Sequence, residues 1–173
     1  MEIMEQRDAW RAHFRARWQY DYRSTGKVSW KHYRYVENTI KEGTAGLSLR
    51  DSKLMFISSA GAFLPASQQP FNAADPEGDY SIRVLPVDLG SDHLGYAHEH
   101  YDNGPVKEDI QVLIPLKHLI DLVAQGKVGA LSPQWISFMG YQPDADRVLE
   151  ETLPLVMNDV KREAPDAAFL VPS

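Results

Sequence analysis

The strongest constraint on the fold is an alternation of short, mostly apolar runs with segments of helical spacing. The apolar runs are residues 54–57, 82–85, 135–139 and 167–171. Runs of this length fit strands that are covered on both faces, and helices are the usual connections between parallel strands. The alternation predicts a layered α/β domain with a largely parallel sheet flanked by helices.

Two helices are indicated by the residues at their ends. Pro115 suits the first turn of a helix with apolar residues at helical spacing, and Gly126 can cap its end. Asp144 can cap a second helix, whose apolar stripe continues to Val160. Pro154 lies inside that stripe, so the pattern predicts a kink or a division of the second helix.

Residues 1–45 have a different pattern from residues 46–173, and we treat the two ranges as separate units. Trp10, Phe14 and Trp18 lie four residues apart, which predicts an amphipathic N-terminal helix. Beyond this helix, aromatic and polar residues alternate up to residue 35, and the alternation favours a hairpin.

Charge is divided unevenly along the chain. Residues 1–50 carry 10 Lys/Arg and 6 Asp/Glu, whereas residues 51–173 carry 8 and 18. Arg7, Arg11 and Arg15 form a basic stripe beside the aromatic one, so the N-terminal helix could bind an acidic partner, nucleic acid included. A helix packed on its own domain is the favoured interpretation, and nucleic acid ranks last among the partners considered.

The composition excludes several classes of protein. The 173 residues include no cysteine, which excludes a disulfide framework, thiolate metal sites and a thiol nucleophile. No apolar run approaches the length of a membrane span, and the first residues lack the pattern of a signal peptide. We therefore expect no membrane association and a cytoplasmic location.

The densest group of titratable side chains is the block His98, Glu99, His100, Tyr101 and Asp102. In extended backbone His98, His100 and Asp102 share one face, and imidazoles with a carboxylate are suitable ligands for zinc or iron. The same three residues are candidate catalytic groups, because imidazolium can bind a substrate carboxylate and imidazole can move a proton near neutral pH. Glu99 and Tyr101 on the other face are candidate substrate contacts. The remaining alternative is an exposed polar loop without a role.

A loop of small residues, 58–62, follows the first apolar run. Small side chains let backbone N–H groups approach a ligand carboxylate or phosphate, so Ser59 and Gly61 are candidate substrate contacts. The alternative is that Gly61 only permits a tight turn. We expect this loop and the imidazoles of His98 and His100 to share a cleft, within about 15 Å, which is the span of four to five extended residues.

Several short blocks occur in a characteristic order over roughly residues 45–173. They are Ser59-Ala60-Gly61-Ala62, Gln69-Pro70-Phe71, Gly78-Asp79, Ile82-Arg83-Val84-Leu85-Pro86, His98-Glu99-His100-Tyr101-Asp102, Gly129-Ala130-Leu131-Ser132 and Ser137-Phe138-Met139-Gly140. In their order and spacing the chain resembles the selenoprotein B family of the glycine, sarcosine, betaine and D-proline reductases.

The resemblance implies reductive cleavage of a C–N bond in a small amino acid or an N-methylated relative. In this family a selenocysteine or cysteine follows the strand that matches residues 167–171 and attacks the substrate, and a partner subunit supplies a carbonyl group. This chain has no such residue. The resemblance therefore implies a substrate-side subunit or fragment, inactive alone, in which His98, His100 and Asp102 bind or protonate the substrate.

A second class of function stays open at this point. The chain could be a stand-alone protein that binds a metal or a small ligand on the same scaffold. Stoichiometric zinc or iron that is lost when His98 and His100 are replaced would favour this class.

Two further expectations concern assembly. An apolar strand at residues 167–171 leaves a sheet edge to be covered, which predicts a homo-oligomer or a complex with a redox partner subunit. Because the selenocysteine of the family is encoded by UGA, we also expect codon 174 of the gene to be UGA, with an open frame beyond it.

Overall fold

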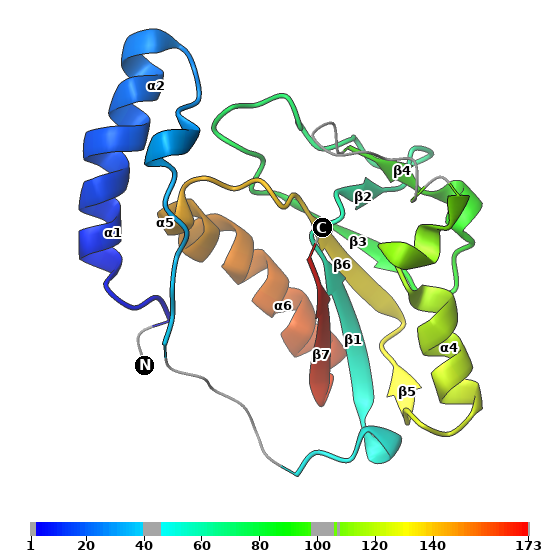
Figure 1. Cartoon of the computed structure of the whole chain (residues 1–173). Coiled ribbons are helices and arrows are strands. Elements are labelled where there is room, and N and C mark those ends of the chain that lie inside the picture. The colour runs from blue at the N-terminus through cyan, green and yellow to red at the C-terminus, as the bar shows by residue number, and fades with distance from the viewer. Residues whose placement is uncertain (1–2, 40–45, 98–105, 107, 173) are drawn as a thin grey trace.

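The computed structural model describes residues 3–39, 46–97, 106 and 108–172. Its centre is a five-stranded sheet (Figure 1). The strands are β1 (Lys53–Ser58), β3 (Ile82–Pro86), β5 (Ala130–Leu131), β6 (Gln134–Phe138) and β7 (Ala167–Val171). Strands β5, β6 and β7 all pair with β1 in parallel, and β3 pairs with β6 antiparallel. The predicted largely parallel sheet is confirmed, with one antiparallel strand at its edge.

Two helices cover opposite faces of this sheet. Successive side chains of β1 alternate between the two faces, so each helix contacts a different set of them. Leu54 and Phe56 of β1 belong to the cluster under α4 (Leu116–Ala124). Met55 and Ile57 belong to a second cluster, which packs against Val156 and Val160 of α6 (Leu153–Glu163). The layers are therefore helix, sheet and helix, as predicted.

The predicted start of each helix and the predicted end of the first are confirmed, with Pro115 one residue before the first helical position. Pro115 is the N-cap of α4, and Gly126 adopts a positive φ of 65° beyond the end of α4 while its N–H donates to the Val123 carbonyl. Asp144 accepts a hydrogen bond from the Asp146 N–H at 3.0 Å and so caps α5 (Ala145–Arg147). Between α5 and α6 lies a π-helical stretch, η6 (Val148–Thr152). Proline lacks the N–H that an α-helix needs, so the π turn just before Pro154 is the predicted irregularity.

The N-terminal unit is helical further than predicted. It consists of α1 (Arg7–Phe14), a π-helical stretch η1 (Arg15–Gln19) and α2 (Tyr20–Thr25). The prediction of a hairpin after Trp18 is wrong for this range. Four aromatic rings stack along this helix at centroid distances of 5.0, 5.1 and 5.7 Å, namely those of Trp10, Phe14, Trp18 and Tyr22. The helical four-residue spacing therefore continues one turn beyond Trp18, into the range for which we predicted a hairpin.

The basic stripe of this helix faces the protein itself. Arg7 Nε donates to Asp146 Oδ1 at 2.6 Å, and Arg11 contacts both carboxylate oxygens of Asp146, one of them at 2.9 Å. The hydrogen bond from Arg11 is the main cause that holds the pKa of Asp146 below its usual value. Two of the three arginines therefore attach α1 to the start of α5, which favours the interpretation of a helix packed on its own domain.

Smaller elements connect these parts. They are η2 (Trp30–His32), η3 (Leu49–Asp51), β2 (Ala62–Phe63), η4 (Ser91–His93), β4 (Gly95–Tyr96) and η5 (Ile110–Val112). Within the residues that the structure describes, no helix is both long enough and apolar enough to cross a membrane.

Candidate functional site at the carboxyl edge of the sheet

The carboxyl ends of the neighbouring strands β1 and β6 form a switch in topology. After β1 the chain passes to the face under α4, since Ala60 and Ala62 belong to that cluster. After β6 it passes to α5 and α6 on the other face. In open α/β sheets small ligands bind at such a point, outside the carboxyl ends of the strands. This edge is the candidate site.

The loop 58–62 lies at this edge, and its backbone N–H groups are already engaged. Ser59 N–H donates to Val171 O at 3.2 Å, Ala60 N–H to Ser58 Oγ at 3.2 Å, Gly61 N–H to Phe138 O at 2.9 Å and Ala62 N–H to Ser137 Oγ at 2.7 Å. An anion could use these N–H groups only if the hydrogen bonds opened. The positive φ of 62° at Gly61 fits the alternative of a tight turn.

Three buried serines surround the turn. Ser58 and Ser137, which are adjacent in the pairing of β1 with β6, accept the loop N–H groups described above. Ser59, a predicted substrate contact, is also buried. Sequence reasoning missed Ser137 as a partner of this loop, although it lies in one of the family-like blocks. Its hydrogen bond to Ala62 joins residues 75 positions apart, which no local pattern reveals.

A two-stranded sheet brings Ala97, the residue before the histidine block, to this loop. Strand β2 pairs antiparallel with β4, and the Ala97 N–H donates to the Gly61 carbonyl at 3.0 Å. Gly95 allows this approach, because a Cβ there would lie 2.7 Å from the Phe63 ring. Ala97 is the residue before His98.

The block itself lies outside the described residues. His98, Glu99, His100, Tyr101 and Asp102 are not among them. The predicted proximity of the imidazoles to the loop therefore stays a prediction. Within the part of the chain that the structure describes, there is no group of three or more His, Asp or Glu residues able to hold a metal ion.

Other family-like blocks have structural roles. The Arg83 guanidinium lies 4.2 Å from the centroid of the Phe71 ring, and its Nε donates to the Gln69 carbonyl at 3.0 Å. A Cβ at Gly78 would lie 2.9 Å from the Tyr141 carbonyl oxygen, and Asp79 accepts the Asn72 N–H at 2.8 Å. The first and last of these contacts fix the shape of the segment 69–83, and Gly78 lets this segment approach Tyr141 closely.

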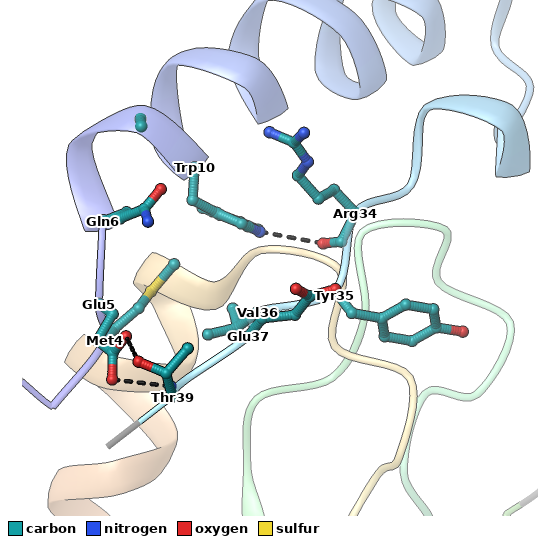
Figure 2. Close-up of a pocket in the computed structure, with 10 residues that line it drawn as sticks. Met4, Glu5, Gln6, Trp10, Arg34, Tyr35, Val36, Glu37 and Thr39 are labelled. Atoms are coloured by element: carbon teal, nitrogen blue, oxygen red, sulfur yellow. Dashed lines mark hydrogen bonds between the residues drawn. The ribbon is translucent and has the colours of Figure 1, made fainter.

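A hollow of about 260 Å³ lies beside the start of α1, lined by none of the residues of the loop 58–62 (Figure 2). Trp10 Nε1 donates to the Arg34 carbonyl at 3.0 Å on one side of it, and Glu5 accepts both the N–H and the hydroxyl of Thr39 at 2.8 Å (Figure 2). These polar groups attach the segment 34–39 to α1 and to the residues just before it. The hollow therefore belongs to the packing of the N-terminal unit.

The fold defines an α/β protein, and its candidate site lies where the parallel strands β1 and β6 end. No protein-family profile matches the chain, and no solved structure matches it. It is 35% identical over 122 residues, or 70% of its length, to D-proline reductase subunit gamma of Acetoanaerobium sticklandii. This similarity confirms the predicted resemblance to the selenoprotein B family over part of the chain. The chain spans about half, 49%, of the curated relative that it matches.

Proposed function

We propose that this chain is the substrate-side subunit of a cytoplasmic reductase that cleaves a C–N bond in D-proline or in another small amino acid, such as glycine, sarcosine or betaine. The observation that carries this proposal is the 35% identity to a subunit of D-proline reductase. D-proline ranks first among the substrates because the name of the relative specifies it.

The chemistry requires a second redox component. Reductive cleavage of a C–N bond consumes two electrons and two protons, and it leaves one C–H and one N–H bond in place of the bond that breaks. A dithiol, or a selenol with a thiol, can supply both electrons as it is oxidised to a disulfide or a selenenylsulfide. The chain has no cysteine. In the proposed complex the redox group therefore belongs to polypeptide outside these 173 residues.

The role of this chain is to bind and orient the substrate. Imidazolium at His98 and His100 pairs with the substrate carboxylate, and Asp102 pairs with the amine or passes it a proton. Glu99, Tyr101 and the Ser59 hydroxyl are the further contacts. The hydrogen bond from Ala97 to Gly61 supports this assignment, because it holds the residue before His98 against the loop that contains Ser59.

Binding of D-proline to the purified full chain tests the proposal. We expect saturable binding in isothermal titration calorimetry. Replacing His98 and His100 together by alanine should weaken the binding by about tenfold or more, equivalent to at least about 1.4 kcal/mol. A His93→Ala/His118→Ala variant is the matched control, because both residues lie on other elements, and it should bind normally.

Two results would count against this assignment. If D-proline, sarcosine, betaine and glycine all fail to bind both the chain alone and the chain with its redox partner, the chain has no substrate-side role. Stoichiometric zinc or iron that disappears in the His98/His100 double variant would instead make these histidines metal ligands.

A further inference from the structure

The two edges of the central sheet differ in how they are protected. The outer edge of β3 is covered, because the Gln68 side chain donates from Nε2 to the Val84 carbonyl at 3.0 Å. Strand β3 also contains Arg83 and ends at Pro86. Charged residues, proline and side-chain cover are the usual means by which proteins prevent a free edge from pairing with another chain.

The outer edge of β7 has none of these protections. All five of its residues, Ala167–Val171, pair with β1 along one side. Within residues 3–39, 46–97 and 108–172, no strand and no side-chain hydrogen bond reaches its other side. The strand contains no charged residue and no proline.

Strand β7 also exposes apolar side chains on both faces of the sheet. Phe169 is 40% exposed, and its ring lies 6.3 Å from the ring of Phe56 on the face under α4. Leu170 is 66% exposed and, as the next residue along the strand, points to the face of α6. Parallel strands are normally buried on both faces, so β7 has the composition and pairing of an interior strand.

We propose that the outer edge of β7 receives a further parallel strand with a covering helix, donated by the polypeptide that corresponds to the unmatched part of the D-proline reductase gamma subunit. The match covers 49% of that relative, so about half of the relative lies outside the match, and the relative is longer than this chain. A strand and a helix need about 30 residues or fewer. A second copy of this chain is a poorer occupant, because its α4 and α6 already pack on its own sheet and are not free to cover Phe169 and Leu170. This inference rests on the relationship used for the proposed function.

Co-production of the full 173-residue chain with the unmatched segment of the A. sticklandii subunit tests the proposal. Hydrogen exchange is measured on the β7 amides of the chain alone and of the complex. We expect a 1:1 complex in which the outward-facing β7 amides exchange about tenfold or more slowly. Leu170→Lys should abolish the complex. Ile120→Lys, at a 44% exposed position on α4, is the matched control and should leave it intact.

A single-chain fusion, in which the same segment follows Ser173 through a Gly/Ser linker, covers the case in which the separate segment does not fold. Protection of β7 in the fusion supports the proposal as it does in the complex. Absence of association, or unchanged exchange at β7 in both forms, would overturn it. Self-association of the chain through β7, detected by light scattering and removed by Leu170→Lys, would overturn the proposal, because a second copy would then occupy the edge. D-proline binding is measured separately, so failure of the proposed function and failure of this inference give different results.

Discussion

At the residue scale, Gly129 is required by a close approach of two backbone segments. Its N–H donates to the Leu49 carbonyl at 2.9 Å, and a Cβ at this position would lie 2.8 Å from the carbonyl oxygens of Arg50 and Ser52. Because backbone atoms cannot move aside as a flexible side chain can, we expect Gly129→Ala to lower the free energy of unfolding by about 1–3 kcal/mol. Urea unfolding followed by circular dichroism measures this change.

Gly90→Ala is the matched control for this substitution. The nearest atom to a Cβ at Gly90 is His93 Cδ2 at 3.8 Å, an ordinary van der Waals distance. The free energy of unfolding of this variant should therefore stay within about 0.5 kcal/mol of that of the unsubstituted chain. Equal losses in the two variants would contradict the role assigned to the contact at Gly129.

Because Asp146 binds two arginines of α1, we expect the attachment of α1 to depend on pH in the acidic range. Its hydrogen bonds to Arg11 and Arg7 lower the pKa of Asp146 below the ordinary value of 3.8. A carboxyl whose folded-state pKa is lowered stabilises the fold fully above its unfolded pKa, and this stabilisation is lost as the pH falls through the folded pKa. Attachment of α1 should therefore weaken below about pH 4.

Limited proteolysis between residues 7 and 25 measures this attachment. Asp146→Asn should make the N-terminal helix susceptible at neutral pH and should flatten the acid dependence. Asp8→Asn removes a carboxylate that also pairs with Arg11 but is 96% exposed, and it should change neither property. If both variants behave like the parent chain, the aromatic contacts alone hold the helix.

At the scale of elements, the aromatic stack holds the N-terminal helix on the body. Trp18 is 1% exposed and packs between Phe14 and Tyr22, in a cluster that includes Ala145 and Leu149 of the body. Trp18→Ala should cost the docking of this helix about 3–5 kcal/mol. Hydrogen exchange over residues 7–25 should then become fast while the central sheet stays protected.

Tyr20→Ala tests whether burial of the ring, and not merely loss of an aromatic ring, causes the faster exchange. Tyr20 lies in the same helical run but is 65% exposed, so its removal should leave the exchange of residues 7–25 nearly unchanged. Similar exchange in the Trp18 and Tyr20 variants would contradict the packing described here.

The elements with a local signature could be predicted from the sequence. The strand at residues 54–57 and the helix between Pro115 and Gly126 follow from apolar periodicity and from residues suited to helix ends. The alternation after Trp18 was misleading, because stacked aromatic rings at four-residue spacing also leave polar residues between them. The aromatic cluster of this helix also packs against Leu149 of the body, and a local pattern cannot contain that contact.

The candidate site could be predicted in position but not in detail. A loop of small residues after a buried strand indicates the carboxyl edge of the sheet, and the structure has the loop there. Whether its N–H groups are available depends on partners such as Phe138 and Ser137, which come from a different strand. The chemical block at 98–102 lies outside the described residues, so its role stays a proposal.

At the scale of the whole molecule, the body does not depend on the N-terminal unit for its two main cores. Among the described residues, the clusters under α4 and α6 contain only residues beyond position 46. The N-terminal cluster reaches the body through Ala145 and Leu149, at the start of the second helical run. The division of the chain into residues 1–45 and 46–173 is a prediction that removal of the N-terminal unit can test.

We expect a chain that begins at residue 46 to fold into the same central sheet. Its unfolding should stay cooperative, because the contacts of β1 with β6 and β7 are unchanged. Its stability should fall by a few kcal/mol at most, about what the exposure of one or two large apolar side chains costs, since Leu149 loses its cover. Urea unfolding and an amide NMR spectrum measure both properties, and shifts relative to the full chain should be confined to the surroundings of residues 141–150. A shortened chain with collapsed NMR dispersion would mean that the N-terminal helix is part of the folding unit, and it would contradict the division into residues 1–45 and 46–173.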